Sequence, residues 1–345
     1  MNRKKILEVT DLSVTIPSPN GAVHAVQKSS WYVKEAETIA IVGESGCGKS
    51  VSIQTVMGLY DRRSRRVIEG SVRFHDRELL ELSEKEMRRL QGDRMSFIFQ
   101  DPFTFLDPTM TVGHQITEAY RKHHRVSGAE AKRIAIEMMR TIAIPDPEKN
   151  FSRYPHQFSG GMRQRIMIAI ALICNPEILF ADEPTTALDV TIQAQIIELM
   201  KELKDRFSTS IVLITHDMGV VANMAERIYV MYAGRIVESG SAEEIFYHAA
   251  HPYTQALLNS VPRLDMDAGQ KLYTIHGAPP ELTGEMKGCA FADRCPYAMK
   301  VCRRLQPRMI PMGENDGEVH EAACFLNEPE CIKARGDRMN RQEEM

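Results

Sequence analysis

The chain has 345 residues, a length that suggests one large and one small domain, or two domains. Its hydrophobic content of 43% and charged content of 26% are ordinary for a globular protein and exclude the disordered class. The net charge of −3 gives no electrostatic reason to expect a nucleic-acid partner. No run of about 18 apolar residues occurs, and the basic N-terminus lacks an apolar core. We therefore expect neither a membrane-spanning helix nor a signal peptide.

Short strands dominate the first 42 residues, at 7–9, 12–16, 30–33 and 38–42, with a turn at 17–21. Further strands are predicted at 67–75, 95–99, 178–181, 211–215 and 228–231. Helices are expected from Lys49, from the capping-box pattern at Ser83, and through 111–143 with a break near 127–128. Strands that alternate with helices predict an α/β fold with a parallel sheet. An antiparallel N-terminal portion and an inserted helical stretch, about residues 101–160, flank that sheet.

The alternation ends near residues 238–240, and the following chain is rich in Pro, Gly and Cys. We place a domain boundary near residue 245. The predicted parts are a main domain at 1–245, a C-terminal extension at 246–328 and a polar tail at 329–345. No internal repeat is visible, so the main domain is a single unit.

Residues 43–50 read Gly-Glu-Ser-Gly-Cys-Gly-Lys-Ser and follow the apolar strand 38–42. This is the G-x-x-x-x-G-K-[ST] phosphate loop in its expected setting, between a strand and a helix. The glycines let backbone N–H groups surround a triphosphate, and the helix N-terminus adds positive potential. Lys49 is predicted to reach the β- and γ-phosphates, and the Ser50 hydroxyl to bind Mg²⁺.

An apolar strand at 178–181 ends in two carboxylates, Asp182 and Glu183. Asp182 is placed to hold Mg²⁺ opposite Ser50, and Glu183 to polarise an attacking water. The alternative is a buried strand followed by an acidic helix cap. A phosphate loop upstream in the same chain favours the catalytic interpretation.

A second anion cradle is predicted where Ser159-Gly160-Gly161 opens a long helical run. One nucleotide site does not need two such loops, so the pattern indicates a composite site that covers a nucleotide held by another subunit. The alternative is an ordinary glycine-rich helix cap.

Taken in order, these motifs resemble the ATP-binding subunit of an ABC transporter. The remaining motifs are Phe99-Gln100-Asp101-Pro102, Ala187-Leu188-Asp189 and Thr215-His216-Asp217. The sequence departs from the family pattern in two places. Met162 stands where Gln is usual, and the stretch 17–24 has no aromatic residue to stack on adenine apart from the imidazole of His24.

The resemblance implies a role for each matching residue. ATP and Mg²⁺ are the implied cofactors, with Glu183 and His216 catalytic and Asp189 at a dimer interface. The implied Mg²⁺ ligands are Ser50, Gln100 and Asp182. The implied contacts to the partner's ATP are Ser159, Gly160, Gly161, Met162 and Gln164. The implied nucleotide-binding residues are Gly43, Glu44, Ser45, Gly46, Cys47, Gly48, Lys49, Ser50, Val51 and Gln100.

Three segments, 101–108, 154–165 and 251–258, closely resemble the oligopeptide and dipeptide importers, and the resemblance covers about residues 5–326. It implies an ATPase that energises peptide import from the cytoplasmic face of the cell membrane as a peripheral subunit. The implied partners are a second ATPase subunit, identical or paralogous, two membrane permeases and a solute-binding protein, with no nucleic acid. One alternative is the ATPase of a nickel or other small-solute importer. Two others are a soluble ABC ATPase of translation or DNA repair and a metal-sensing regulator.

The extension carries Cys289, Cys295, Cys302 and Cys324, spaced C-x5-C-x6-C-x21-C. Four thiolates can bind a [4Fe–4S] cluster or tetrahedral Zn²⁺, and the spacing alone does not decide between them. Unliganded packing cysteines are the other alternative. The extension of peptide-importer ATPases is similar at all four positions and is associated with [4Fe–4S], so the resemblance implies that cluster here.

Overall fold

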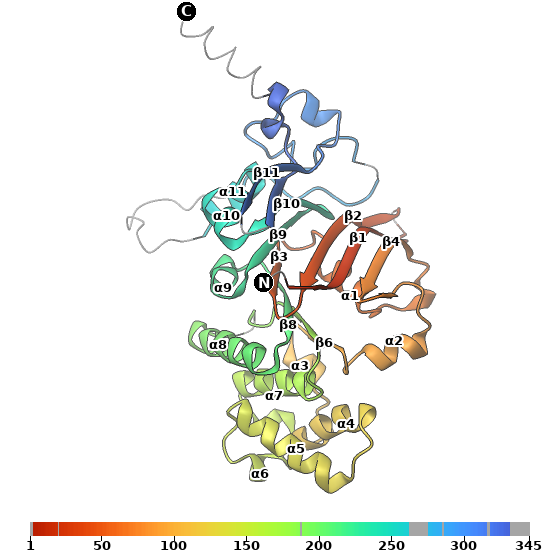
Figure 1. Cartoon of the computed structure of the whole chain (residues 1–345), viewed down its shortest axis with the longest axis vertical. Helices are drawn as coiled ribbons and strands as arrows, with labels where there is room; N and C mark the ends of the chain where they lie inside the picture. The colour runs from red at the N-terminus through yellow and green to blue at the C-terminus, as the bar shows by residue number, and fades with distance from the viewer. Residues whose placement is uncertain are drawn as a thin grey trace, which may run out of the picture.

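The computed structural model describes residues 3–19, 21–186, 188–261, 275–284, 286–315 and 318–331. Figure 1 shows two sheets packed against each other, with the helices between residues 102 and 207 gathered at the end of the molecule opposite the C-terminal region. Ala187 and the tail beyond residue 331 lie outside the described residues. No helix among the described residues is both long and apolar enough to cross a bilayer.

The first sheet is antiparallel, with strand order β2-β1-β4-β5. The predicted strands at 7–9 and 12–16 form one strand that is interrupted by a bulge at Asp11, whose φ is +48°. Gly70 of the neighbouring strand lies against this bulge, and a Cβ there would approach the Asp11 carbonyl oxygen to 2.6 Å. The strands are β1 Lys5–Ile16, β2 Val23–Lys34, β4 Val67–Phe74 and β5 Arg77–Glu78.

The second sheet is mixed, with order β11-β12-β10-β9-β3-β8-β7-β6. Its central strands run parallel, and the predicted strands here agree with the structure to within one residue. They are β3 Thr38–Val42, β6 Met95–Ile98, β7 Ile178–Asp182, β8 Ser210–Thr215 and β9 Arg227–Tyr232. The antiparallel strands are β10 Arg235–Ser241, β11 Ile310–Asn315 and β12 Glu318–Ala322.

The strand β3 shows why these central strands are apolar along their whole length. Ala40 and Val42 face a core shared with the helices, while Ile39 and Ile41 face a second core shared with the antiparallel sheet. A strand that is covered on both faces has no solvent side, so its sequence does not alternate.

Helices cover the mixed sheet, and α4 to α6 form the inserted helical part at the lower end of Figure 1. The capping box predicted at Ser83 is present at the start of α2. The helices are α1 Lys49–Val56, α2 Glu84–Leu90, α3 Pro102–Phe105, α4 Val112–His123, α5 Gly128–Thr141, α6 Pro147–Asn150, α7 Gly160–Leu172, α8 Val190–Phe207, α9 Met218–Met224, α10 Ala242–Tyr247 and α11 Pro252–Asn259. Short 3-10 turns span Arg62–Ser64, Pro155–Gln157, Val301–Arg303 and Phe325–Asn327.

The C-terminal region joins the mixed sheet, which the sequence did not predict. Its strand β12 pairs with β10, and β11 pairs with β12. A buried carboxylate, Glu238 of β10, accepts hydrogen bonds from the backbone N–H groups of Ala250 and His251, at 2.6 and 3.0 Å. It also lies 2.8 Å from the ring of His320 in β12. These contacts fasten the C-terminal region to the sheet.

Candidate functional site

The phosphate loop lies between the end of β3 and the start of α1. The backbone conformation of the loop requires glycine at two positions. Gly43 and Gly48 have φ of +154° and +104°, and a Cβ on either would approach a backbone oxygen to 2.1 Å. Gly48 precedes α1 without a side-chain cap, so the first N–H groups of that helix stay available for an anion.

Lys49 is turned into this loop and is 5% exposed. Its Nζ donates to the carbonyl oxygens of Gly43 and Glu44 at 2.7 and 2.9 Å. Cys47, also in the loop, is buried, and burial raises the pKa of its thiol. The loop therefore presents backbone N–H groups and one ammonium group, the chemistry that a triphosphate requires.

The Ser50 hydroxyl donates to Oδ1 of Asp182 at 3.0 Å. Asp182 is the last residue of β7, so its carboxylate reaches the edge of the sheet where the phosphate loop also lies. Burial raises the pKa of this carboxyl group, a cost that a cation beside it would offset. Two oxygens at this separation fit the hard-ligand preference of Mg²⁺.

Glu183 is held by three side chains. Gln100 donates to its Oε2 at 2.9 Å, Thr186 donates to the same oxygen at 2.9 Å, and the His216 ring lies 3.0 Å from Oε1. Burial alone would raise its pKa, but the hydrogen bonds from His216 and Thr186 outweigh that effect and hold the pKa below its usual range. Glu183 is therefore an oriented carboxylate at neutral pH, as a base requires.

The predicted second cradle opens α7. Ser159 is exposed and caps the helix by accepting from the Met162 N–H at 3.4 Å. A Cβ on Gly161 would lie 2.7 Å from the Ile192 side chain of α8, so the two helix starts pack closely. Asp189 caps α8 by accepting from the Ile192 N–H at 3.0 Å.

Two of the predicted contact residues at this cradle are turned inward. Gln164 is 1% exposed, and its Nε2 donates to the Pro184 carbonyl oxygen at 2.6 Å. Met162 packs against the helical core. In this structure Ser159 is exposed at the N-terminus of α7, while Gln164 is engaged within the chain.

Sequence reasoning missed the contacts that the C-terminal region makes with the phosphate loop. Arg294 forms a bidentate ion pair with Glu44, and the Glu44 N–H donates to the Tyr253 hydroxyl at 2.8 Å. The only signal in the sequence was Glu44 itself, a carboxylate inside a loop that binds an anion.

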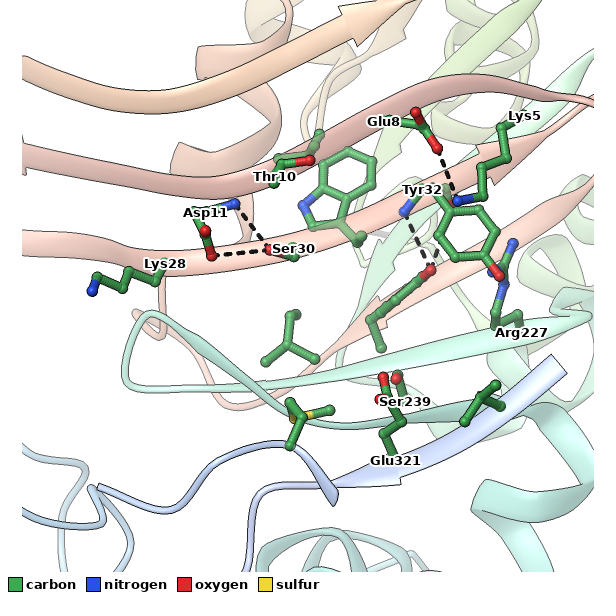
Figure 2. A pocket seen from close by; sticks show the side chains of 16 residues that line it. Lys5, Glu8, Thr10, Asp11, Lys28, Ser30, Tyr32, Arg227, Ser239 and Glu321 are labelled. Atoms are coloured by element: carbon green, nitrogen blue, oxygen red, sulfur yellow. Dashed lines mark hydrogen bonds and ion pairs between the residues drawn. The ribbon is translucent and has the colours of Figure 1, made fainter. Parts of the chain in front are cut away.

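A separate cavity of about 490 Å³ lies between the antiparallel sheet and strands β9, β10 and β12 (Figure 2). In its wall, Lys5 forms an ion pair with Glu8 at 2.8 Å, and the Ser30 hydroxyl donates to the Asp11 carboxylate at 3.4 Å. None of the described phosphate-loop residues 43–50 lines it, so this cavity is not the nucleotide site. The lining residues are Lys5, Glu8, Val9, Thr10, Asp11, Lys28, Ser30, Trp31, Tyr32, Arg227, Tyr229, Ile236, Ser239, Met309, Val319 and Glu321.

Together, the loop, the two acidic residues and the second cradle define an ATP-binding cassette. The family model described as "ABC transporter" matches residues 26–186. The model described as "Oligopeptide/dipeptide transporter, C-terminal region" matches residues 237–302. The chain belongs to the ABC transporter family and, within it, to the oligopeptide and dipeptide transporter ATPases.

Several known proteins are similar to this chain. The chain is 50% identical to the dipeptide transport ATP-binding protein DppD of Bacillus subtilis (strain 168), over 94% of this chain and 96% of that protein. It is 49% identical to the oligopeptide transport ATP-binding protein OppD of Salmonella typhimurium, over 88% and 89%. A solved dimer of the cassette MJ0796, bound to ADP and Pi, superposes with a TM-score of 0.61 at 27% identity, covering 68% of this chain and 98% of that one.

The iron–sulfur prediction is wrong, and the zinc alternative fails with it. All four predicted ligands, Cys289, Cys295, Cys302 and Cys324, lie within the described residues. Yet those residues contain no group of three or more His, Cys, Asp or Glu that could hold a metal ion. Burial raises the pKa of Cys289 to about 11 and that of Cys324 to about 12, so these thiols are neutral at physiological pH in the metal-free chain. Cys302 and Cys324 are buried, and Cys289 and Cys295 pack against the core that the mixed sheet shares with the helices.

Proposed function

We propose that this protein is the ATP-hydrolysing subunit that energises import of dipeptides or oligopeptides through an ABC transporter. The observation that carries the proposal is the ordered carboxylate of Glu183, next in sequence to Asp182 and held by three side chains. The names of the similar proteins support a peptide substrate, and so does the match to the transporter C-terminal region.

In the proposed site, Lys49 and the loop N–H groups bind the β- and γ-phosphates. Ser50, Asp182 and the amide oxygen of Gln100 would hold Mg²⁺. When bound, that ion neutralises phosphate charge and orients the terminal phosphoryl group. Gln100 already donates its Nε2 to Glu183, so one amide would link the ion site to the base.

Glu183 would take a proton from the attacking water, with its low pKa keeping the carboxylate ready. His216, 57% exposed at its side chain, would turn from Glu183 toward the γ-phosphate. A second ATPase subunit, identical or paralogous, would complete each site with its own Ser159 region. Asp189 would lie at the interface between the two subunits.

We further propose that the subunit works at the cytoplasmic face of the membrane with two permeases and a solute-binding protein. The contact with the permeases would lie near Gln100, which is exposed and precedes the inserted helices. The main domain would end near residue 245 and the C-terminal region would begin there.

Glu183→Gln tests the catalytic part of the proposal. Removal of a positioned base lowers the hydrolysis rate by about 10² to 10⁴ and leaves ATP binding intact. Glu198 is an exposed glutamate of α8, and Glu198→Gln is the matched control, which is expected to keep the parental hydrolysis rate. Hydrolysis at the parental rate by the Glu183→Gln protein would show that the assigned base is wrong.

Peptide uptake tests the physiological part. Cells that lack the subunit are expected to lose growth on short peptides and to resist toxic peptide analogues. The parental protein restores both phenotypes, and Glu183→Gln restores neither. Normal peptide uptake with defective nickel uptake would assign the protein to the metal importers instead.

A further inference from the structure

Glu44 puts a carboxylate inside the loop that receives a polyanion. Its two carboxylate oxygens accept from the two terminal nitrogens of Arg294, at 2.6 and 2.9 Å. The pair is sheltered, since the Arg294 side chain is 6% exposed and that of Glu44 is 23% exposed. The Glu44 charge is thus neutralised by a residue 250 positions further along the chain.

Arg294 is itself fixed by its surroundings. Its Nε donates to the His276 carbonyl oxygen at 3.0 Å, and one terminal nitrogen donates to the Tyr232 hydroxyl at 3.2 Å. A guanidinium held in this way pairs with Glu44 at a small additional cost in side-chain entropy.

The backbone of Glu44 is held from the same region. Its N–H donates to the hydroxyl of Tyr253, which is completely buried on α11. The Tyr253 ring packs 4.5 Å from the ring of Tyr232 and 5.4 Å from that of Phe291. The Glu44 carbonyl oxygen accepts from Lys49, the residue expected to bind phosphate. The side chain, amide and carbonyl of one loop residue therefore each have a defined partner.

We propose that Arg294 and Tyr253 are positioning residues of the nucleotide site, so that the C-terminal region sets the affinity of the phosphate loop for ATP. Arg294 cancels the Glu44 charge and turns that carboxylate away from the phosphates. Tyr253 fixes the loop backbone beside Lys49. Both residues lie in the stretch 237–302 that matches the transporter C-terminal region, whereas Glu44 lies in the stretch that matches the cassette.

Electrostatics predicts a specific pattern among variants. Arg294→Met leaves the Glu44 carboxylate without its cation beside the triphosphate. Loss of one partner from a sheltered charge pair weakens binding by about ten- to a hundredfold here. Adding Glu44→Gln removes the stranded charge, because replacing both partners costs far less than removing one. The double variant is therefore expected to recover most of the lost affinity.

The experiment uses the full chain and measures the Kd for ATP, with KM and kcat for hydrolysis alongside. In Arg294→Met, the loss of ATP affinity is expected to appear in Kd and KM rather than in kcat. The loss is expected to shrink as the salt concentration rises, because it is electrostatic. Arg294→Lys is expected to restore most of the affinity. Tyr253→Phe keeps the ring packing and removes the acceptor, so a smaller, severalfold loss is expected. Arg303→Met is the matched control, since Arg303 pairs with Asp293 on the surface of the same region.

Three results would overturn the inference. They are parental ATP affinity in folded Arg294→Met, failure of folded Arg294→Met/Glu44→Gln to recover affinity, and an equal loss in Arg303→Met. Thermal unfolding of each variant identifies those that are folded. If Arg294→Met does not fold, Tyr253→Phe carries the test, and parental ATP affinity in that folded variant overturns the inference. The inference rests on ATP binding by the parental chain. An absence of ATP binding by that chain would count against the proposed function rather than against Arg294.

Discussion

Replacement of Gln164 by Met tests whether this glutamine acts within its own chain. The side chain lies one turn into α7, and its amide donates to the carbonyl oxygen of Pro184, the residue after Glu183. Met keeps the length and the helix propensity of Gln but cannot donate a hydrogen bond.

The magnitude follows from burial. Gln164 is 1% exposed and Pro184 is buried, so the substitution leaves a carbonyl oxygen without a donor and without access to water. A buried acceptor that loses its partner lowers the free energy of unfolding by about 1–3 kcal/mol. Urea unfolding with an unchanged m-value would measure this loss directly.

Gln195→Met supplies the control. Gln195 is exposed on α8 and accepts from Arg165 at 3.4 Å, so its replacement changes stability by about 0.5 kcal/mol or less. Equal stability of the two variants would refute the reasoning. So would a Gln164→Met protein of parental stability that has lost ATP-dependent dimerisation, because that result assigns Gln164 to the partner's nucleotide.

Two further predictions concern His320 and Gly48. The hydrogen bond to Glu238 raises the pKa of His320, so protonated His320 stabilises the fold at acidic pH and this stabilisation is lost as pH rises through the raised pKa. His320→Gln is therefore expected to lose more stability at pH 6 than at pH 9 by urea unfolding, and an equal or opposite difference contradicts the assignment. Gly48→Ala is expected to abolish ATP binding, because its Cβ would meet the Ala25 carbonyl oxygen at 2.1 Å. Gly21→Ala, with φ of +112° and open space around it, is the control that keeps binding, and equal binding by both proteins contradicts the prediction.

The sequence predicted the central sheet well because its signal is local. Runs such as 38–42 and 178–181 are apolar throughout, and burial on both faces requires that pattern. The strand β1 was divided in two because the polar bulge at Asp11 breaks the pattern, while pairing with β2 and β4 carries the strand across it. Because that pairing joins residues far apart in the sequence, no local sequence pattern predicts it.

The C-terminal region was the hardest part to predict. The segment 310–315 contains Pro and Gly, and β12 is largely polar, so the sequence of neither segment predicts a strand. The pairing of β12 with β10 is visible only in the structure. Arg294 belongs to none of the motifs described above, and its pairing with Glu44 is visible only in the structure. The prediction of a metal site at the four cysteines was wrong for a different reason. The cluster was implied by the resemblance to peptide-importer ATPases, because the spacing of the four cysteines left the ligand open. Neither the resemblance nor the spacing fixes how four thiols lie relative to one another.

The pairing of β12 with β10 also protects the protein from unwanted association. Without the C-terminal strands, β10 would be the last strand of the mixed sheet and would present unpaired backbone groups to other chains. Where β12 pairs with β10, at Glu238 and Ser239, the exposed edge of the sheet is β11 instead. In β11, Pro311 lacks an N–H group and the register shifts between Pro311 and Gly313. Such an edge is a poor template for another strand. The C-terminal region therefore makes aggregation through this sheet edge less favourable before the subunit assembles with its partners.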